Sequence, residues 1–196
     1  METTRRVFAI LLVVGMPPAV TFWLLVHPLA VFWRRVGPGW AYTLLAGAEI
    51  ALAGLLFLLR DRLLGRDLGT NWPLIAIGAL LYVGAIWLSV LCRRHLRLSA
   101  FAGGPELSPS AYPGRLLQEG LYARIRHPRY ASVIVGTSGF ALVANHAGAY
   151  MVVGISLLLL WPVILLEERE LAARFGPEYE AYRRRTPALL PRWRRR

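Results

Sequence analysis

Long apolar runs limit what this chain can fold into more than any other feature of its sequence. Three runs, at about 7–33, 40–59 and 72–92, are each bounded by arginines. A helix needs about 20 consecutive apolar residues to cross the hydrocarbon of a bilayer. The mean hydropathy of +0.46 also exceeds that of an ordinary soluble domain. The sequence therefore predicts an integral membrane protein.

A further apolar stretch at 130–166 is too long for one crossing. It is interrupted at 145–148, so we expect a helical hairpin with spans near 130–144 and 149–166. Pro17 and Pro18 should kink or break the first span. That span is expected to be retained, because it is long and lacks a small-residue cleavage site. The expected fold is all-α, a single membrane domain over 1–196 with about five transmembrane helices, in which a helix continues from Glu168 to Arg185.

Arginine distribution predicts the orientation of the chain. All 23 basic residues are arginine, and the formal net charge is +12. With five spans, 18 arginines lie on the side of the connection 93–129 and the tail 167–196, against five on the other. Cytoplasmic loops carry the excess of positive charge, so connection and tail should be cytoplasmic. We expect the cytoplasmic membrane of a bacterium or archaeon, with lipid headgroups rather than nucleic acid as the partner of these arginines.

Three groups of residues could carry chemistry at this cytoplasmic edge. The first is Gly120–Tyr130, which places tyrosines, arginines and His127 where the connection re-enters the membrane. The second is Glu167-Glu168, directly after the last span. The third is 175–187, where Tyr179, Tyr182 and Arg183 share one helix face. Each group also has a structural explanation, as a headgroup-binding segment, a helix exit with salt bridges and an amphipathic interfacial helix, respectively.

The order and spacing of these groups resemble the isoprenylcysteine carboxyl methyltransferases and the related phospholipid N-methyltransferases. The resemblance covers about 75 residues, from Gly120 to Pro191: Arg-His-Pro-x-Tyr, an apolar hairpin, Glu-Glu, Phe-Gly-x-x-Tyr-x-x-Tyr and Arg-x-Pro. The first 110 residues match only as hydrophobic spans. The resemblance implies that the C-terminal half forms a cytoplasmic pocket for S-adenosylmethionine, which a lipophilic or lipid-linked substrate reaches from the bilayer.

The resemblance also implies roles for individual residues. Glu167 and Arg185 would be catalytic, with Arg185 near the carboxylate of the substrate. The cofactor-binding residues would be Gly120, Tyr122, Arg126, His127, Pro128, Tyr130, Glu167, Glu168, Tyr179 and Tyr182. Two segments depart from the family pattern, Ala131-Ser132 and Ala123-Arg124-Ile125, and they leave the shape of the pocket open.

Several acceptor chemistries fit the same residues. A carboxylate is already ionised and needs an arginine to orient it, which favours O-methylation. An amine would have to lose a proton, which Glu167 or His127 could accept. A thiol acceptor is a further alternative. Two other classes also remain open: an NADPH-dependent enzyme similar to sterol reductases, and a membrane protein without enzymatic activity.

Glu49 lies in the middle of the second apolar run. An acid inside the membrane suggests a functional site, here a polar group lining the substrate entrance, although a structural hydrogen bond would also explain it. His27, His95, His127 and His146 are scattered, and Cys92 is the single cysteine. The sequence therefore predicts no metal site. It also contains no glycine-rich nucleotide loop of the soluble type.

Overall fold

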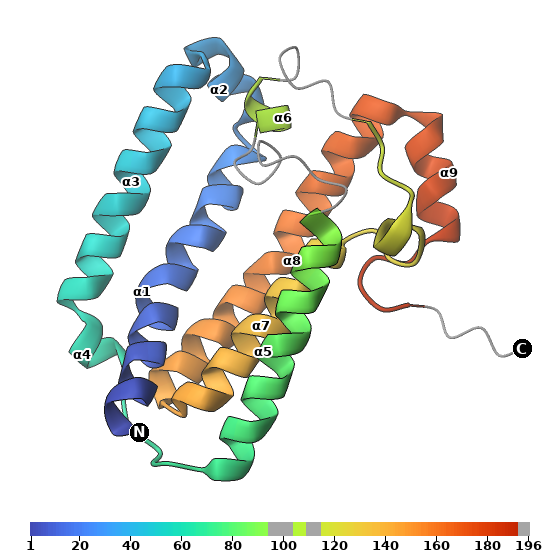
Figure 1. Cartoon of the computed structure of the whole chain (residues 1–196). Helices are drawn as coiled ribbons and strands as arrows, with labels where there is room; N and C mark the ends of the chain where they lie inside the picture. The colour runs from blue at the N-terminus through green and yellow to red at the C-terminus, as the bar shows by residue number, and fades with distance from the viewer. Residues whose placement is uncertain (94–103, 109–114, 192–196) are drawn as a thin grey trace, which may run out of the picture.

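A computed structural model describes residues 1–93, 104–108 and 115–191, and the structural statements below concern these residues. Much of the predicted connection 93–129 and the end of the tail lie outside them. Helices are the only regular elements in this part of the chain (Figure 1). In order they are α1 (Glu2–Val26), α2 (Ala30–Val36), α3 (Pro38–Leu58), α4 (Arg60–Leu63), α5 (Trp72–Arg93), α6 (Gly104–Leu107), the 3-10 helix η2 (Gly120–Ala123), α7 (Pro128–Ala144), α8 (Ala147–Phe175) and α9 (Pro177–Arg185).

Within the described residues, four helices are long and apolar enough to cross a membrane: α1, α3, α5 and α8. The chain is therefore an all-α integral membrane protein, as predicted. The predicted hairpin is present as α7 and α8, which meet at Asn145-His146. At 17 residues, α7 is shorter than these four and lies along α5 (Figure 1).

The first apolar run forms two helices, which corrects the prediction of one span over 7–33. Helix α1 continues through Pro17 and Pro18 and ends at Val26, and α2 begins at Ala30. Pro28 explains the break, because it lacks the N–H that the next helical turn would need. The indole of Trp33 donates a hydrogen bond to the Leu25 carbonyl at 2.9 Å, which satisfies one of the acceptors exposed at the end of α1.

Glycines allow α5 and α7 to approach closely. A Cβ atom at Gly78 would lie 2.6 Å from the Gly139 carbonyl oxygen, and a Cβ at Gly139 would lie 2.6 Å from that of Gly78. Because lipid is as apolar as the helix surfaces, van der Waals contact between small residues is a main source of helix association in membranes. This contact aligns α7 with α5 and sets the position at which α7 begins.

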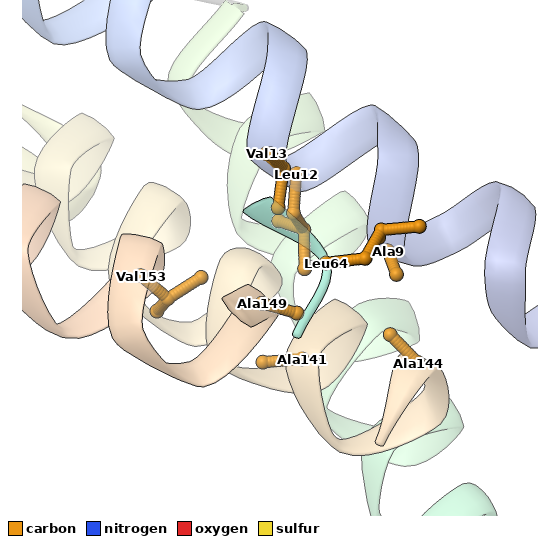
Figure 2. Packing of buried hydrophobic residues seen from close by; sticks show 8 residues of the cluster. All are labelled: Ala9, Leu12, Val13, Leu64, Ala141, Ala144, Ala149 and Val153. Atoms are coloured by element: carbon orange, nitrogen blue, oxygen red, sulfur yellow. The ribbon is translucent and has the colours of Figure 1, made fainter. Parts of the chain in front are cut away.

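A cluster of small side chains joins α1 to the α7–α8 hairpin. Ala9 and Val13 of α1 face Ala141 and Ala149, and Leu64 lies beside them (Figure 2). Ala9, Ala144 and Ala149 are fully buried. The hairpin is therefore held against α1 by close backbone contact.

A buried polar network closes the end of the bundle where α1 begins. The Arg5 guanidinium is 2% exposed, pairs with Asp67 and donates to Thr70 Oγ1 at 3.3 Å. Asn145, which has a left-handed φ of 49°, donates through Nδ2 to the Gly69 carbonyl at 2.8 Å. These polar contacts connect α1, the loop before α5 and the α7–α8 turn at the end of the bundle away from α9 (Figure 1).

Helix α8 positions the acidic pair at the other end. Its 29 residues span about 44 Å at 1.5 Å per residue, which exceeds the ~30 Å of hydrocarbon. Its last turns, with Glu167 and Glu168, therefore extend beyond the apolar part. The expected continuous helix to Arg185 is wrong, because α8 ends at Phe175. Gly176 adopts φ 53° and ψ −130°, and Pro177 starts α9 without an N–H donor.

Candidate active site

Two segments far apart in the sequence lie side by side at the start of α7. The backbone N–H of Arg126 donates to the Pro187 carbonyl at 2.8 Å, and that of His127 donates to the Ala188 carbonyl at 2.9 Å. The segment after α9 is thereby fixed to the residues that enter the membrane. Two of the predicted groups, 120–130 and 175–187, thus meet in one place.

Arg126 connects this place to α8 and α9. Its Nε donates to Glu168 Oε1 at 2.9 Å, and its Nη2 contacts the same oxygen. Its Nη1 donates to the carbonyls of Arg183 and Thr186, at the end of α9. A cation at a helix C-terminus also interacts favourably with the helix dipole. Arg126 therefore holds α9 over the end of α8.

His127 lies between the two carboxylates predicted from the sequence. Its Nε2 is 3.0 Å from Glu168 Oε1, and its Nδ1 is 3.6 Å from Glu167 Oε2. The imidazole is buried, with 4% of the residue exposed. Glu167 Oε2 is buried but makes no hydrogen bond to any residue that the structure describes. The 3.6 Å contact with His127 thus leaves a hydrogen-bonding position on Glu167 unused.

The two tyrosines of α9 are buried beside this cluster. Tyr182 donates to the Tyr122 carbonyl at 2.6 Å. Tyr179 is fully buried, and its hydroxyl has no hydrogen-bond partner among the described residues. Burial raises the pKa of Tyr182 to about 12 and also raises that of Tyr179, so both remain neutral at physiological pH. The Tyr182 hydroxyl is therefore satisfied within the fold, whereas the Tyr179 hydroxyl is enclosed close to Arg126 and Glu168.

A cavity of about 400 Å³ opens on the other side of Glu167. It lies between the end of α1, α2 and the last turns of α8, and its polar lining residues are His27, Arg34, Glu167, Glu170 and Arg174. Its size falls in the range of small-molecule sites, about 300–1,000 Å³. Because Glu167 both lines the cavity and faces His127, the cavity and the cluster are adjacent.

An apolar groove of about 490 Å³ lies within the bundle, between α1, α5 and α7. Its polar lining includes Ser89, Ser132 and Thr137, and Arg93 lies at the end of α5. Ser89 Oγ donates to Ser132 Oγ at 3.2 Å. The Thr137 hydroxyl donates to the Val133 carbonyl at 2.8 Å within its own helix. With these polar groups satisfied, the groove suits a hydrocarbon chain.

The other predicted site residues lie at varying distances from the cluster. Gly120 starts η2 with φ 60°. Pro128 begins α7, and the Tyr130 ring lies 5.6 Å from the His127 ring, so both adjoin the cluster. Arg185 is exposed and bonds to Gln118, with its guanidinium 5.9 Å from the Tyr182 ring.

Glu49 is not brought to the cluster. It lies on α3, which packs mainly on α1 and α2 and stands on the opposite side of the bundle from α9 (Figure 1). Both carboxylate oxygens of Glu49 are enclosed, without a hydrogen-bond partner among the described residues. Its role in substrate binding stays a prediction.

The sequence analysis did not identify His27 and Glu170 as a pair. His27 Nδ1 lies 2.9 Å from Glu170 Oε2, and both residues line the cavity. One signal was present: Glu170 follows Glu167 by three residues and therefore lies on the same helix face. No spacing rule connects either acid to His27, which is 143 positions from Glu170. In the described part of the chain, no group of three or more His, Cys, Asp or Glu side chains is arranged to hold a metal ion.

Comparisons with known proteins match this chain to one family and to several curated proteins. The family model described as phospholipid methyltransferase matches residues 74–178. The nickel-cobalt-cadmium resistance protein NccN of Alcaligenes xylosoxydans xylosoxydans is 28% identical over 58% of this chain and 51% of its own length. Methanethiol S-methyltransferase 2 of Bradyrhizobium diazoefficiens is 31% identical over 62% and 49%, respectively. Protein-S-isoprenylcysteine O-methyltransferase of Schizosaccharomyces pombe is 31% identical over 39% and 33%.

The chain spans about half the length of the first two relatives and a third of the last. No solved structure matches the chain significantly.

Proposed function

Because the chain belongs to the phospholipid methyltransferase family, we propose that it is an S-adenosylmethionine-dependent methyltransferase acting on a lipophilic acceptor within the membrane. The proposal extends to the site: the C-terminal half, from η2 to the segment after α9, holds the cofactor. We also propose that this site faces the cytoplasm, because the arginine-rich side predicted from the sequence includes α2, the end of α5 and α9.

The observation that carries the proposal is the pair of unused polar atoms beside His127. The Tyr179 hydroxyl and Glu167 Oε2 are both buried, and neither has a hydrogen-bond partner among the described residues. A buried polar atom left unsatisfied costs about 1–3 kcal/mol. A ligand with hydroxyl and ammonium groups, such as this cofactor, would satisfy both atoms. These two polar atoms therefore match the hydroxyl and ammonium groups of S-adenosylmethionine.

The chain's own contribution would be positioning and electrostatics. The bound cofactor supplies an electrophilic methyl group on a sulfonium. Glu167 would accept hydrogen bonds from the polar groups of the cofactor, and the tyrosine faces of α9 would hold its positive charge. Holding two reactants in line can supply about 7–11 kcal/mol of the barrier in well-oriented cases. Arg126 would act indirectly, because its guanidinium is occupied by Glu168 and the carbonyls at the end of α9.

The lipophilic nature of the acceptor is supported by the groove between α1, α5 and α7. Its wall is formed by α7 and by α1 and α5, which are long and apolar enough to cross a membrane, and Arg93 lies at one end. An acyl or prenyl chain could lie there with its polar end toward the start of α7. Such a chain would enter from the bilayer without crossing water.

If the reaction is carboxyl O-methylation, the chemistry favoured by the sequence, Arg185 should orient the carboxylate of the acceptor. Arg185→Ala should leave cofactor binding unchanged and reduce transfer to a fatty acid by roughly 10- to 100-fold, because a charged hydrogen bond is worth about 1.5–3 kcal/mol. The measurement is transfer of a tritiated methyl group from S-adenosylmethionine to octanoic acid, octylamine and octanethiol by the full chain in lipid nanodiscs.

The acceptor panel also tests the proposed function itself. Transfer to at least one acceptor, abolished in Glu167→Ala, supports a methyltransferase at this site. Transfer to octanoic acid that Arg185→Ala leaves unchanged would remove Arg185 from the site. A folded wild type that binds no cofactor would contradict the proposed function.

A further inference from the structure

We propose that the groove between α1, α5 and α7 limits the chain length of the methyl acceptor, and that the acceptor is an acidic amphiphile whose hydrocarbon chain spans about one leaflet of the bilayer. Phe140 and Tyr82 would stop the end of the chain, and Gly15 would leave its path open. This inference rests on the proposed function, because it concerns the acceptor of the same reaction. The shape, the length, the charge and the position of the groove each support it.

One end of the groove is closed by aromatic rings in contact. Tyr82 of α5 and Phe140 of α7 both line the groove, and their ring centroids are 4.6 Å apart. The ring of Phe8, on α1, lies 4.7 Å from that of Phe140. Beside these rings, Gly78 and Gly139 bring the backbones of α5 and α7 together. A chain that enters from the other end would therefore stop at the aromatic floor formed by Phe8, Tyr82 and Phe140.

The length of the groove corresponds to one leaflet. Its lining residues extend from Tyr82 to Arg93 on α5 and from Ser132 to Phe140 on α7. At 1.5 Å per residue, these stretches measure about 17 Å and about 12 Å, respectively. The hydrocarbon core is ~30 Å thick, so one leaflet contributes ~15 Å. A chain that begins at Arg93 would therefore reach the aromatic floor near the middle of the membrane.

Gly15 leaves the middle of the groove open. It lines the groove, and a Cβ atom at this position would meet nothing within 4 Å. It follows Phe8 by seven residues, so it lies about 10 Å along α1 from the aromatic floor. Where α5 and α7 meet, by contrast, a Cβ at Gly136 would already lie 3.1 Å from the Ala85 side chain. The space available to a chain therefore depends on the absence of a side chain at Gly15.

The charge at the open end of the groove favours an acidic head group. Arg93, the last residue of α5, lines the groove there, and the described lining residues include no acid. A guanidinium has five N–H donors and can bind a carboxylate through two of them while it keeps other contacts within the protein. Arg93 would attract such a head group to the open end, in addition to the role expected of Arg185. The Ser89 and Ser132 hydroxyls donate to Ser132 and to the Arg129 carbonyl, respectively, so both donors are used within the fold.

The open end also lies next to the proposed cofactor site. Helix η2 contacts α5, and its Tyr122 interacts electrostatically both with Cys92, the neighbour of Arg93, and with Glu167. A head group at Arg93 would therefore be close to the residues proposed to hold the methyl donor, as an in-line displacement requires. In that step, a carboxylate oxygen forms the new bond to the methyl carbon. The methyl–sulfonium bond breaks, its electron pair remains on the sulfur, and no proton is transferred.

Photolabelling tests where the chain ends. Dodecanoic acid, whose extended chain is about as long as the groove, would carry a diazirine at the end of its chain and be added to the full chain in phosphatidylcholine nanodiscs. The label should fall on the aromatic floor. Gly15→Phe should lower this labelling by roughly tenfold or more, because the added ring occupies the path of the chain. Gly47→Phe is the matched control: it adds the same ring on α3, where a Cβ also meets nothing within 4 Å, and should leave the labelling unchanged.

Methyl transfer tests whether the groove limits chain length. Wild type should methylate dodecanoic acid at least as fast as octanoic acid, and icosanoic acid roughly tenfold more slowly, because a chain too long for the groove displaces its head group. Phe140→Ala removes part of the aromatic floor and should bring icosanoic acid within about threefold of dodecanoic acid. S-adenosylhomocysteine should bind Gly15→Phe and Phe140→Ala as it binds wild type, which shows that both variants fold.

Four results would overturn the inference. The first is a label spread over lipid-exposed residues such as Trp87 in wild type and Gly15→Phe alike, which would show that the groove holds ordinary bilayer lipid. The second is an equal loss of labelling in Gly15→Phe and Gly47→Phe. The third is equal transfer by wild type to all three fatty acids. The fourth is transfer to octylamine or octanethiol but to no fatty acid, which would contradict the acidic head group.

None of these four results would contradict the proposed function. Failure of a folded wild type to bind S-adenosylhomocysteine would contradict it instead, and the photolabelling does not depend on that binding.

Discussion

Tyr179 and Tyr182 lie one turn apart on α9 and present the same hydroxyl group to two different environments. The Tyr182 hydroxyl is satisfied by the Tyr122 carbonyl, and its burial stabilises the fold of the re-entry segment. The Tyr179 hydroxyl is buried without a partner among the described residues, which is unfavourable for folding alone. A residue kept at such a cost is explained by a ligand that supplies the missing partner.

Replacing each tyrosine by phenylalanine should therefore have opposite consequences. Tyr182→Phe should lower the free energy of unfolding by about 1 kcal/mol through the lost hydrogen bond. Tyr179→Phe should not lower it, but should weaken S-adenosylhomocysteine binding by roughly 5- to 20-fold. Thermal unfolding and calorimetric titration of both variants measure the two effects. The reverse pattern would show that the hydroxyl of Tyr179 serves the fold.

Individual residues also show where prediction from sequence ends. The clustering of His127, Glu167 and Tyr179 was expected from the order of the motifs, and the structure brings these side chains together. The pair of His27 and Glu170 was not expected, because tertiary packing of α1 against α8 creates it. The sequence around His27, at the end of an apolar run, does not indicate which helix will pack against it.

Among the helices, α5 and α7 make the most extensive contact, and glycine makes it possible. Gly78 faces the Gly139 backbone, whereas a Cβ atom at Gly84, on the same helix, would meet nothing within 4 Å. The start of α7 bears Pro128 and Tyr130, so displacement of α7 would move the site.

Gly78→Ala and Gly84→Ala are thus matched substitutions with different expected outcomes. Gly78→Ala should destabilise the bundle by about 1–3 kcal/mol through overpacking. Gly84→Ala should be neutral or stabilising by up to about 1 kcal/mol, because alanine favours helix. Thermal unfolding in the same detergent measures both. Equal stability of the two variants would show that α5 and α7 are less closely packed than described here.

Element boundaries were the least predictable part of the fold. The hairpin of α7 and α8 followed from apolar length and from the interruption at Asn145-His146. The breaks at Pro28 and Gly176 were missed for different reasons. Pro17 and Pro18 were expected to kink or break the first span, yet α1 continues through both, because membrane helices tolerate proline where neighbouring groups satisfy the backbone. At Gly176, the charged pattern on both sides continued with a helical period, which concealed the turn.

The whole molecule has polar networks at both ends of an apolar bundle. The network of Arg5, Asp67 and His146 joins three chain segments at the end away from α9. The network of Arg126, His127 and Glu168 joins three others at the proposed site. At the second network, Glu167 has an unused carboxylate oxygen and lines the cavity of about 400 Å³, so we propose a ligand-binding role for the second network and a structural role for the first.

The structural role of the network of Arg5, Asp67 and His146 predicts that the stability of the protein depends on pH. The backbone N–H of Gly69 is the main factor holding the pKa of Asp67 below its ordinary 3.8, with Arg5 also contributing and burial opposing. The stabilisation that ionised Asp67 gives the folded protein is therefore present at neutral pH. It is lost only as the pH falls below 3.8 and through the lower pKa that Asp67 has in the folded protein. Asp67→Asn should lower the free energy of unfolding at neutral pH by about 1–2 kcal/mol, since solvent partly screens the pair.

The measurement is the melting temperature of both proteins against pH. The gap between wild type and Asp67→Asn should be constant at neutral pH and should narrow in acid. A gap that persists in acid would contradict the charged pairing of Asp67 with Arg5.

At the scale of the whole chain, the order of motifs was the most informative part of the sequence. It predicted membership of this methyltransferase family, which the match over 74–178 confirms. The order of motifs could not predict the acceptor, because the groove and the cavity are formed by helices of the first 93 residues as well. The family match begins at residue 74 and so includes most of α5, which corrects the expectation that the first 110 residues match only as hydrophobic spans. The residues before it lie outside the match, so their side chains become informative only once packed.

The most direct test of the central claim is calorimetric binding of S-adenosylhomocysteine to the purified full chain. Wild type, Glu167→Ala and Asp61→Ala should be titrated side by side. Asp61 is an exposed carboxylate at the opposite end of the bundle and serves as the control. We expect wild type and Asp61→Ala to bind alike and Glu167→Ala to lose at least about tenfold in affinity, by the strength of a charged hydrogen bond. A folded wild type without affinity, or a Glu167→Ala variant that binds as wild type, would contradict the cofactor site described here.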